Sequence, residues 1–332
     1  MTKCSRCRIG MAAAKIFIIA ALVFLTVRSL AIEIFAIPPE NNYIAPGGKV
    51  MAPESKAFSF AVASDSGAKN APIERIVRLA QDEGNQFILY LGDLVRYRNI
   101  SHFRWIISEL DEKLEFPFYM IPGNHEIANH FGRQDKSLYK MLFGPLYYWF
   151  SYRDVMFIGL DSSEEKYNEA QLSWLEDVLE KIRPHYKYCI VYTHVPPLSK
   201  PQWKKKIYVD GSTERMAALL RQHRVDLILA GHIHQYWKGE MQGIPVVTLM
   251  SSGQKTRGEI EKFGYLSVQI SEDGVGEIVP HYLEDNYEED NEYIELLLSN
   301  VLVDERSLLV CLLMLVMGVI LAAGAFMFGR GR

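Results

Sequence analysis

Short, continuously apolar runs alternate along residues 56–283 with segments whose apolar positions recur at helical spacing. Continuous apolar runs are typical of strands buried on both faces, and they predict strands at 57–64, 86–92, 116–123, 186–193 and 225–231. Helical spacing predicts helices at 71–84, 101–114, 168–183 and 212–223. Residues 146–161 form a predicted pair of strands, and further strands follow from residue 236. This pattern predicts an α/β fold in which two sheets pack together with helices outside.

The apolar pattern changes at both ends of the chain. Residues 307–328 are uncharged and apolar for long enough to cross a bilayer as a helix. Residues 16–27 form a shorter apolar core behind a cationic leader, which is typical of a signal peptide or a signal anchor. Lys and Arg residues precede the first segment, and Arg330 and Arg332 follow the second. By the positive-inside rule we expect both ends to be cytoplasmic and the domain between them to face outward from the cell membrane.

These boundaries divide the chain into six parts. We expect an N-terminal signal anchor or signal peptide at 1–37, a linker at 38–55, the folded domain at 56–283, an acidic spacer at 284–306, a transmembrane helix at 307–328 and a basic cytoplasmic tail at 329–332. The formal net charge of −4 argues against a general nucleic-acid binder, so we expect no nucleic-acid partner. The domain contains a single cysteine, Cys189, which cannot form a disulfide within it. The oligomeric state stays open.

Polar residues of a narrow chemical range follow five of the predicted strands. They are Asp65, Asp93, the run Asn124-His125-Glu126, His194, and the pair His232 and His234. Ligand sites in α/β proteins gather at the carboxyl ends of strands, and carboxylate, amide and imidazole groups all bind metal cations. There are more donors than one metal needs, so the pattern predicts two metal ions. In an extended segment His232 and His234 point the same way, so adjacent metals can each take one.

Each of these residues also has an ordinary structural explanation when it is taken alone. An aspartate after a strand is usually a turn residue, and asparagine before a helix is a common cap. Asp161 and the serines after it also end an apolar run, and we interpret them as the entry to the helix at 168–183. The ordered combination of all five strand ends favours a metal site over these separate explanations.

The order D-x-x, G-D, G-N-H-E, H and G-H-x-H resembles that of the calcineurin-like metallophosphoesterases, and the resemblance covers residues 57–283. It implies a four-layer αββα sandwich that binds two divalent or trivalent metal ions, such as Mn, Fe or Zn. The implied ligands are Asp65 and His234 for the first metal, Asp93 as the bridge, and Asn124, His194 and His232 for the second.

The first motif departs from the commonest form of this family. That form begins D-x-H, whereas this chain has Asp65-Ser66-Gly67, so one histidine of the first metal site is absent. Purple acid phosphatases also have D-x-G, and there a tyrosine from G-D-x-x-Y completes the site. The corresponding run here puts Tyr97 one residue late. We therefore expect Tyr97 to pack nearby or stay clear of the metal, and water to complete the coordination of a less tightly held ion.

The donors predict hydrolysis of phosphate esters by metal-bound hydroxide. The resemblance implies that His125 gives a proton to the leaving group, and we expect Glu126 to orient its imidazole ring. The expected substrate is a phosphorylated small molecule or lipid, because the loops at 96–105 and 196–208 carry basic and aromatic residues and the domain is tethered to the membrane. Two alternatives stay open: a phosphodiesterase or pyrophosphatase acting on nucleotide, sugar or lipid phosphates, and a non-catalytic, metal-dependent receptor for a phosphorylated ligand.

Overall fold

The computed structural model describes residues 57–67, 70–129, 131–200, 209–256 and 262–284, together with Ile18, Ala20, Ala21, Val23, Lys49, Val50, Trp203 and Ile207. Most of the predicted N-terminal segment at 1–37, and all but one residue of the predicted spacer together with the whole membrane helix and tail at 285–332, lie outside these residues. Within the described part of the chain, no helix has the length and apolar character needed to cross a membrane.

The larger sheet contains seven strands in the spatial order β1-β5-β6-β7-β8-β10-β9. Their bounds are β1 Lys49–Val50, β5 Tyr148–Tyr152, β6 Val155–Leu160, β7 Tyr188–Thr193, β8 Leu227–Ala230, β9 Trp237–Met241 and β10 Ile244–Thr248. Strands β6, β7, β8 and β10 are parallel, whereas β5 and β9 run antiparallel to their neighbours β6 and β10. Strand β1 pairs in parallel with β5, so part of the predicted linker at 38–55 belongs to this sheet.

The smaller sheet contains five strands in the order β12-β11-β2-β3-β4. Their bounds are β2 Phe58–Ala63, β3 Ile88–Tyr90, β4 Phe118–Met120, β11 Gly264–Ser271 and β12 Gly274–Tyr282. Strands β2, β3 and β4 are parallel, and β11 joins them antiparallel to β2. Strands β11 and β12 come last in the domain, and β11 pairs with β2, the first strand of this sheet. The smaller sheet is therefore complete only after the rest of the domain has been synthesised.

Helices follow the predicted periodicity. The long ones are α2 Asn70–Asp82, α3 Ile100–Lys113, α6 Glu169–Lys181 and α7 Gly211–Gln222. Asn168 and Asp210 precede α6 and α7, and their side chains accept hydrogen bonds from backbone N–H groups of the first turn, as N-caps do. Three short elements are not predicted by the apolar pattern: α4 Asn124–Ile127, α5 Ser137–Phe143 and a 3₁₀ helix at Arg183–His185.

The inner core lies between the two sheets and is rich in aromatic rings. Phe87, which precedes β3, stacks on Phe60 of the same sheet with ring centroids 5.2 Å apart. It also meets Phe150 and Phe157 of the larger sheet edge-on, at 5.6 Å and 5.3 Å. These four side chains are no more than 1% exposed. Their burial joins the two sheets face to face.

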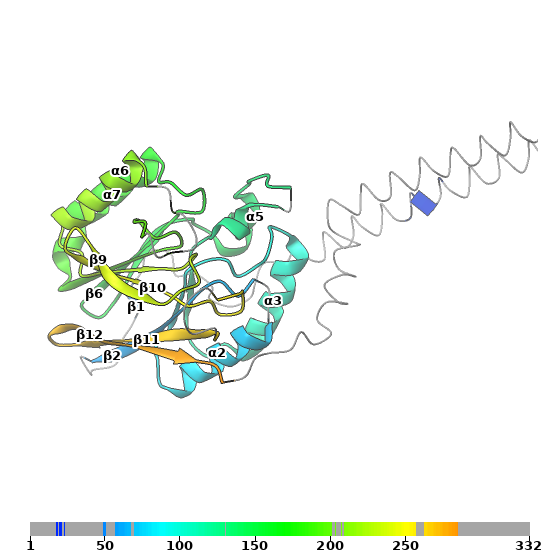
Figure 1. The fold of residues 1–332 in the computed structure, drawn as a ribbon, viewed down its shortest axis with the longest axis horizontal. Coiled ribbons are helices and arrows are strands. Elements are labelled where there is room, and N and C mark those ends of the chain that lie inside the picture. Colours follow the sequence, from blue (N-terminus) through cyan, green and yellow to red (C-terminus); the bar gives the residue numbers. More distant parts are fainter. Residues whose placement is uncertain are drawn as a thin grey trace, which may run out of the picture. The chain divides into compact units, whose positions relative to one another are not determined.

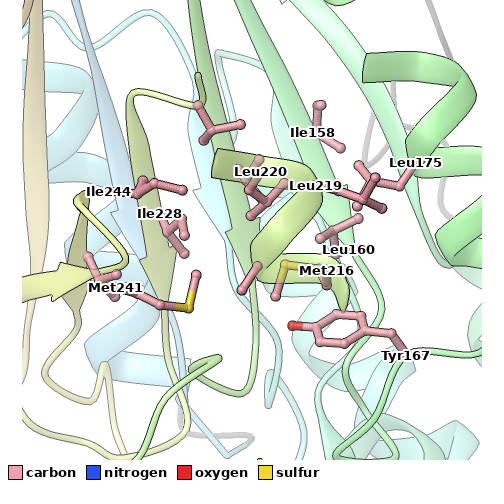
Figure 2. Close-up of a cluster of buried hydrophobic side chains, with 14 of the residues drawn as sticks. Ile158, Leu160, Tyr167, Leu175, Met216, Leu219, Leu220, Ile228, Met241 and Ile244 are labelled. Atoms are coloured by element: carbon pink, nitrogen blue, oxygen red, sulfur yellow. The ribbon is translucent and has the colours of Figure 1, made fainter. Parts of the chain in front are cut away.

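A second core lies between the larger sheet and its helices. Figure 2 shows Ile158 and Leu160 of β6 and Ile228 of β8 in one buried cluster with Leu175 of α6 and Met216 of α7. On the other side of the domain, α2 lies beside β11 in the smaller sheet (Figure 1), and its apolar face is fully buried. The domain therefore has two mixed sheets with helices against their outer faces, which confirms the two-sheet α/β prediction.

Candidate metal centre

The predicted ligands come from both sheets, and every one follows a strand that belongs to a parallel set. Asp65, Asp93 and Asn124 follow β2, β3 and β4 of the smaller sheet. In the larger sheet His194 follows β7, and both His232 and His234 follow β8. Parallel strands end at the same edge of a sheet, and the two sheets lie face to face. The fold therefore brings side chains from 65 to 234 into one site.

Three of the other predicted ligands converge on His194. Its Nε2 lies 3.4 Å from Oδ2 of Asp93, 3.0 Å from Nδ1 of His232 and 3.2 Å from Oδ1 of Asn124. The donor atoms of Asp93, His194 and His232 all lie within 4.8 Å of one another, and the three residues are buried. Nδ1–H of His194 donates to the Leu91 carbonyl over 2.7 Å. This bond fixes the ring so that Nε2 faces the cluster, as in metal-binding histidines.

Asp65 and His234 form a second pair beside this cluster. Nε2 of His234 lies 3.2 Å from Oδ1 of Asp65, while its Nδ1–H donates to the Lys255 carbonyl over 2.8 Å. Oδ2 of Asp65 accepts the backbone N–H of His232 over 3.0 Å, which links the pair to the cluster. Asp65 and His234 thus lie as a pair beside the cluster around His194.

Electrostatic coupling links the buried carboxylates to the histidines beside them. Burial alone raises the pKa of a carboxyl group, but the neighbouring His194 lowers the pKa of Asp93 below its usual range, and His234 does the same for Asp65. In return, although burial opposes it, Asp93 raises the pKa of His194 to about 9. Buried carboxylates that hold protons on adjacent imidazoles are groups from which a metal ion can displace those protons.

The donor set also fits metal ions chemically. Oδ1 of Asp65 is buried and, among the described residues, makes no hydrogen bond of acceptable geometry although it faces His234. Carboxylate, amide and imidazole donors together suit borderline and hard cations such as Zn, Mn and Fe. The residues present therefore fit a centre with two metal ions.

Four of the six predicted ligands have a left-handed backbone. The φ angles are 62° at Asp65, 57° at Asp93, 68° at His232 and 55° at His234. Non-glycine residues rarely adopt this conformation, and it persists mainly where the surrounding structure enforces it at functional sites. The expectation that His232 and His234 share an extended segment is therefore wrong. A turn, and not the two-residue repeat of a strand, directs one histidine to each group of donors.

Glycines make room for the ligands. A Cβ added at Gly123 would lie 2.3 Å from Oδ1 of Asp93, and one at Gly92 would lie 2.4 Å from the backbone nitrogen of Gly123. A Cβ at Gly231 would lie 2.9 Å from Oδ2 of Asp65. These are the glycines of the G-D, G-N-H-E and G-H-x-H motifs. A side chain would not fit at any of these three positions, because residues that follow another strand approach the backbone closely there.

Glu126 has a different role from the predicted one. Its fully buried carboxylate accepts the backbone N–H groups of Gly123 and Asp93, both over 2.7 Å, and of Val95 over 3.2 Å. The imidazole of His125 is held instead by the Arg96 carbonyl, which contacts its Nδ1. Burial, together with the charge of Asp93, raises the pKa of Glu126 to about 7. Glu126 therefore ties together the two loops that carry Asp93 and Asn124.

The model of the calcineurin-like phosphoesterase family matches residues 58–236, which is more than half of the chain. The protein belongs to this family. It is 27% identical over 192 residues to a probable glycerophosphodiester phosphodiesterase GpdQ of Arcobacter nitrofigilis, covering 53% of this chain and 66% of that protein. It is 29% identical over 204 residues to the probable purple acid phosphatase 20 of Arabidopsis thaliana, covering 55% of this chain and 47% of that protein. The matches thus span about half to two thirds of these relatives.

The fold is also similar to that of a solved phosphatase. The purple acid phosphatase PPD1 from yellow lupin superposes with a TM-score of 0.54 at 15% identity, over 65% of this chain and 50% of that one. At this identity the likeness concerns the fold alone. It agrees with the two mixed sheets described above.

Tyr97 packs beside His125. Its ring is tilted against that of His125, with the centroids 6.1 Å apart, and the guanidinium of Arg96 lies 5.9 Å from its centroid. Tyr97 therefore belongs to the surroundings of His125. Nε2 of His125 lies 3.7 Å from Oδ2 of Asp93, and the His125 side chain is 29% exposed. His125 thus stands at the solvent side of the buried cluster.

The prediction that Asp161 opens the next helix is wrong, since α6 begins only at Glu169. Asp161 is buried and pairs with Lys136, whose Nζ lies 2.7 Å from its Oδ2. The next residue, Ser162, accepts the backbone N–H of Val195 and the hydroxyl of Thr193, both over 2.8 Å. These bonds hold the residues on either side of His194. The position of Asp161 and Ser162 at the end of a parallel strand is the signal that could have indicated this role.

Proposed function

We propose that this protein is a metal-dependent phosphoesterase that is anchored in the cell membrane and faces outward. One observation carries the catalytic part of the proposal. Asp93, His194 and His232 converge within 4.8 Å beside the Asp65–His234 pair, at an edge where the strands of two sheets end. Membership of the calcineurin-like phosphoesterase family gives this arrangement its chemistry.

Two metal ions would be held by the residues that the geometry groups together. Asp65 and His234 would hold one ion, and Asn124, His194 and His232 the other, with Asp93 between them. When bound, such ions supply Lewis acidity that activates water and offsets charge on the phosphoryl oxygens. Hydrogen bonds to the ligands support these roles, because the Leu91 and Lys255 carbonyls orient the rings of His194 and His234.

In this proposal His125 moves a proton. Its Nδ1 is fixed by the Arg96 carbonyl, so Nε2 is the atom that can carry a proton toward the site. It lies 3.7 Å from Oδ2 of Asp93 and is the most exposed of the site histidines. A proton held at Nε2 can pass to the departing alkoxide oxygen of an ester, because this ring stands between the buried donors and solvent.

A comparison of leaving groups tests this assignment. Purified His125→Ala should keep both metals and lose about 10²–10⁴-fold in turnover of an alkyl phosphate. Hydrolysis of p-nitrophenyl phosphate should suffer less, because p-nitrophenolate departs without a proton. His185→Ala is a matched control, since His185 is exposed in the 3₁₀ helix that precedes β7, whereas His194 follows the opposite end of that strand. Loss of metal from His125→Ala, or equal damage with both substrates, would contradict the role of proton donor.

The substrate is a phosphorylated small molecule or lipid in this proposal. A diester is favoured by one relative's name, glycerophosphodiester phosphodiesterase, and a monoester by the other's, purple acid phosphatase. To decide between a diester and a monoester, the rates of hydrolysis of p-nitrophenyl phosphate and bis(p-nitrophenyl) phosphate should be compared, with Mn(II), Zn(II) or Fe added. The alternative of a non-catalytic receptor is supported by Gly67, where D-x-H relatives have a histidine. Metal-dependent turnover of either compound would exclude it.

Anchoring and orientation rest on the terminal sequences. Residues 16–27 and 307–328 are apolar, and more basic residues lie on their outer flanks than on their inner flanks, where Arg28 and Arg306 stand. A reporter that is active only in the cytoplasm should be active when fused after Arg332 and silent when placed within 284–295. The reverse pattern would refute an outward-facing domain.

A further inference from the structure

The two groups of donors are unequal. Asn124, His194 and His232 accompany Asp93 on one side, whereas only Asp65 and His234 face each other on the other. The residue two positions after Asp65 is Gly67, which has no side chain to contribute. The first metal ion would therefore have one protein ligand fewer than the second.

The space beside Gly67 is filled by another side chain. A Cβ placed on Gly67 would lie 2.6 Å from Cγ of Gln254 and 3.0 Å from both its Cδ and its Nε2. The carboxamide of Gln254 thus occupies the position that a side chain at 67 would take. It comes from a loop nearly 190 residues later in the sequence, after β10.

The loop that carries Gln254 is bonded to both members of the Asp65–His234 pair. Its backbone N–H donates to the Asp65 carbonyl over 2.9 Å, and the hydroxyl of Ser251 donates to the same carbonyl over 2.8 Å. The next residue, Lys255, accepts Nδ1–H of His234 through its carbonyl. The loop at 251–255 therefore bonds to the backbone of Asp65 and to the ring of His234, and Gln254 belongs to this loop.

The amide nitrogen of Gln254 lacks a partner. Nε2 is buried, and among the described residues no atom accepts a hydrogen bond from it. A buried N–H group without an acceptor destabilises a fold unless something else satisfies the buried position. Half a turn about the last side-chain bond exchanges the nitrogen with Oε1. An amide oxygen is a good ligand for hard and borderline cations, as Asn124 would be on the other side.

We propose that Oε1 of Gln254 is the missing protein ligand of the first metal ion, in place of the histidine absent at Gly67. This inference rests on the two-metal centre of the proposed function. The glycine at 67 suits this arrangement, since a Cβ there would lie 2.6 Å from Cγ of Gln254 and the backbone has a left-handed φ of 62°. Tyr97 lies instead beside His125, with the ring centroids 6.1 Å apart.

Metal titration of substituted proteins tests the assignment. Gln254→Met removes the donor oxygen and keeps the side-chain volume, Gln254→Glu keeps an oxygen, and Gln222→Ala at the exposed end of α7 is the control. Binding of Mn(II) and Zn(II) would be followed by equilibrium dialysis and elemental analysis, with circular dichroism melting of the metal-free proteins to verify folding. Gln254→Met should bind one ion at least about tenfold more weakly and the other unchanged. Gln254→Glu and Gln222→Ala should keep both ions.

The outcomes separate the two proposals. Two ions with wild-type affinities on folded Gln254→Met would overturn the ligand role of Gln254 and leave the metal centre standing. Equal weakening by Gln254→Met and Gln254→Glu, with unchanged melting, would overturn it as well, because the glutamate retains an oxygen donor. Fewer than two ions on the wild-type protein would overturn the proposed function and this inference with it.

Discussion

Substitution of Gly123 by alanine tests how tightly the metal centre is packed. Gly123 precedes α4 with φ −95° and ψ −178°, a conformation that alanine adopts without strain. The added methyl group, however, would lie 2.3 Å from Oδ1 of Asp93, 2.5 Å from the Asp93 nitrogen and 2.9 Å from Cε1 of His194. Any effect therefore arises from displacement of the predicted ligands and not from the backbone of residue 123.

The size of the effect follows from these contacts. Ordinary van der Waals contact begins at 3.4 Å, so the difference from 2.3 Å requires a movement of about 1 Å. Neither neighbour moves easily, because the Asp93 nitrogen and the Gly123 nitrogen are both bonded to the buried carboxylate of Glu126. A displacement of about 1 Å at a catalytic site costs roughly 10²-fold in rate. The overpacked site should also lose about 1–3 kcal/mol of stability.

The assay compares Gly123→Ala with Gly211→Ala. Gly211 begins α7, and a Cβ there meets no atom within 4 Å. That variant should keep full activity and gain about 0.5–1 kcal/mol, because alanine loses less entropy than glycine in a helix. Metal content, turnover of an aryl phosphate and urea denaturation should be measured on both. Gly123→Ala with two metals and turnover within twofold of wild type would refute the reasoning about ligand packing.

Three further predictions concern other residues. Asp93→Asn should abolish turnover and lower the content of both metals, and a variant that kept two metals and near-normal turnover would show that Asp93 is not the bridge. Cys189 should resist alkylation by maleimide in the folded protein, because burial raises the pKa of its thiol to about 12; rapid labelling without unfolding would contradict this. Asp210→Ala should lower the free energy of unfolding at pH 7 by about 1 kcal/mol, through loss of the α7 cap. Because hydrogen bonds from Ser212 and Thr213 lower the pKa of Asp210 below 3.8, its contribution is present above that pH and lost as the pH falls through the folded-state value. The difference in free energy of unfolding between Asp210→Ala and wild type should therefore become smaller toward low pH. A difference that stays constant with pH would contradict the role of Asp210 as a cap.

Local features of this protein could be predicted from its sequence. Helices α6 and α7 follow from their apolar spacing, and the strands from continuous apolar runs, because both patterns depend on neighbours within a few residues. The order of donors along the chain also indicated two metals, since carboxyl ends of parallel strands meet at one edge. That rule needs only the order of the elements and not the strand pairing. The assignment of Asp65 and His234 to the first metal stays a prediction.

Only the tertiary structure decided which residues support those donors. Glu126 was expected to orient His125, but it binds backbone groups of Asp93 and Val95, more than thirty residues away. Gln254 reaches Gly67 because β10 lies in one sheet, β11 in the other, and the loop between them crosses the edge where Asp65 lies. Contacts of this kind join segments far apart in the sequence, and no local pattern of apolar and polar residues encodes them. They arise from strand order and from the packing of one sheet on the other, which are properties of the whole domain.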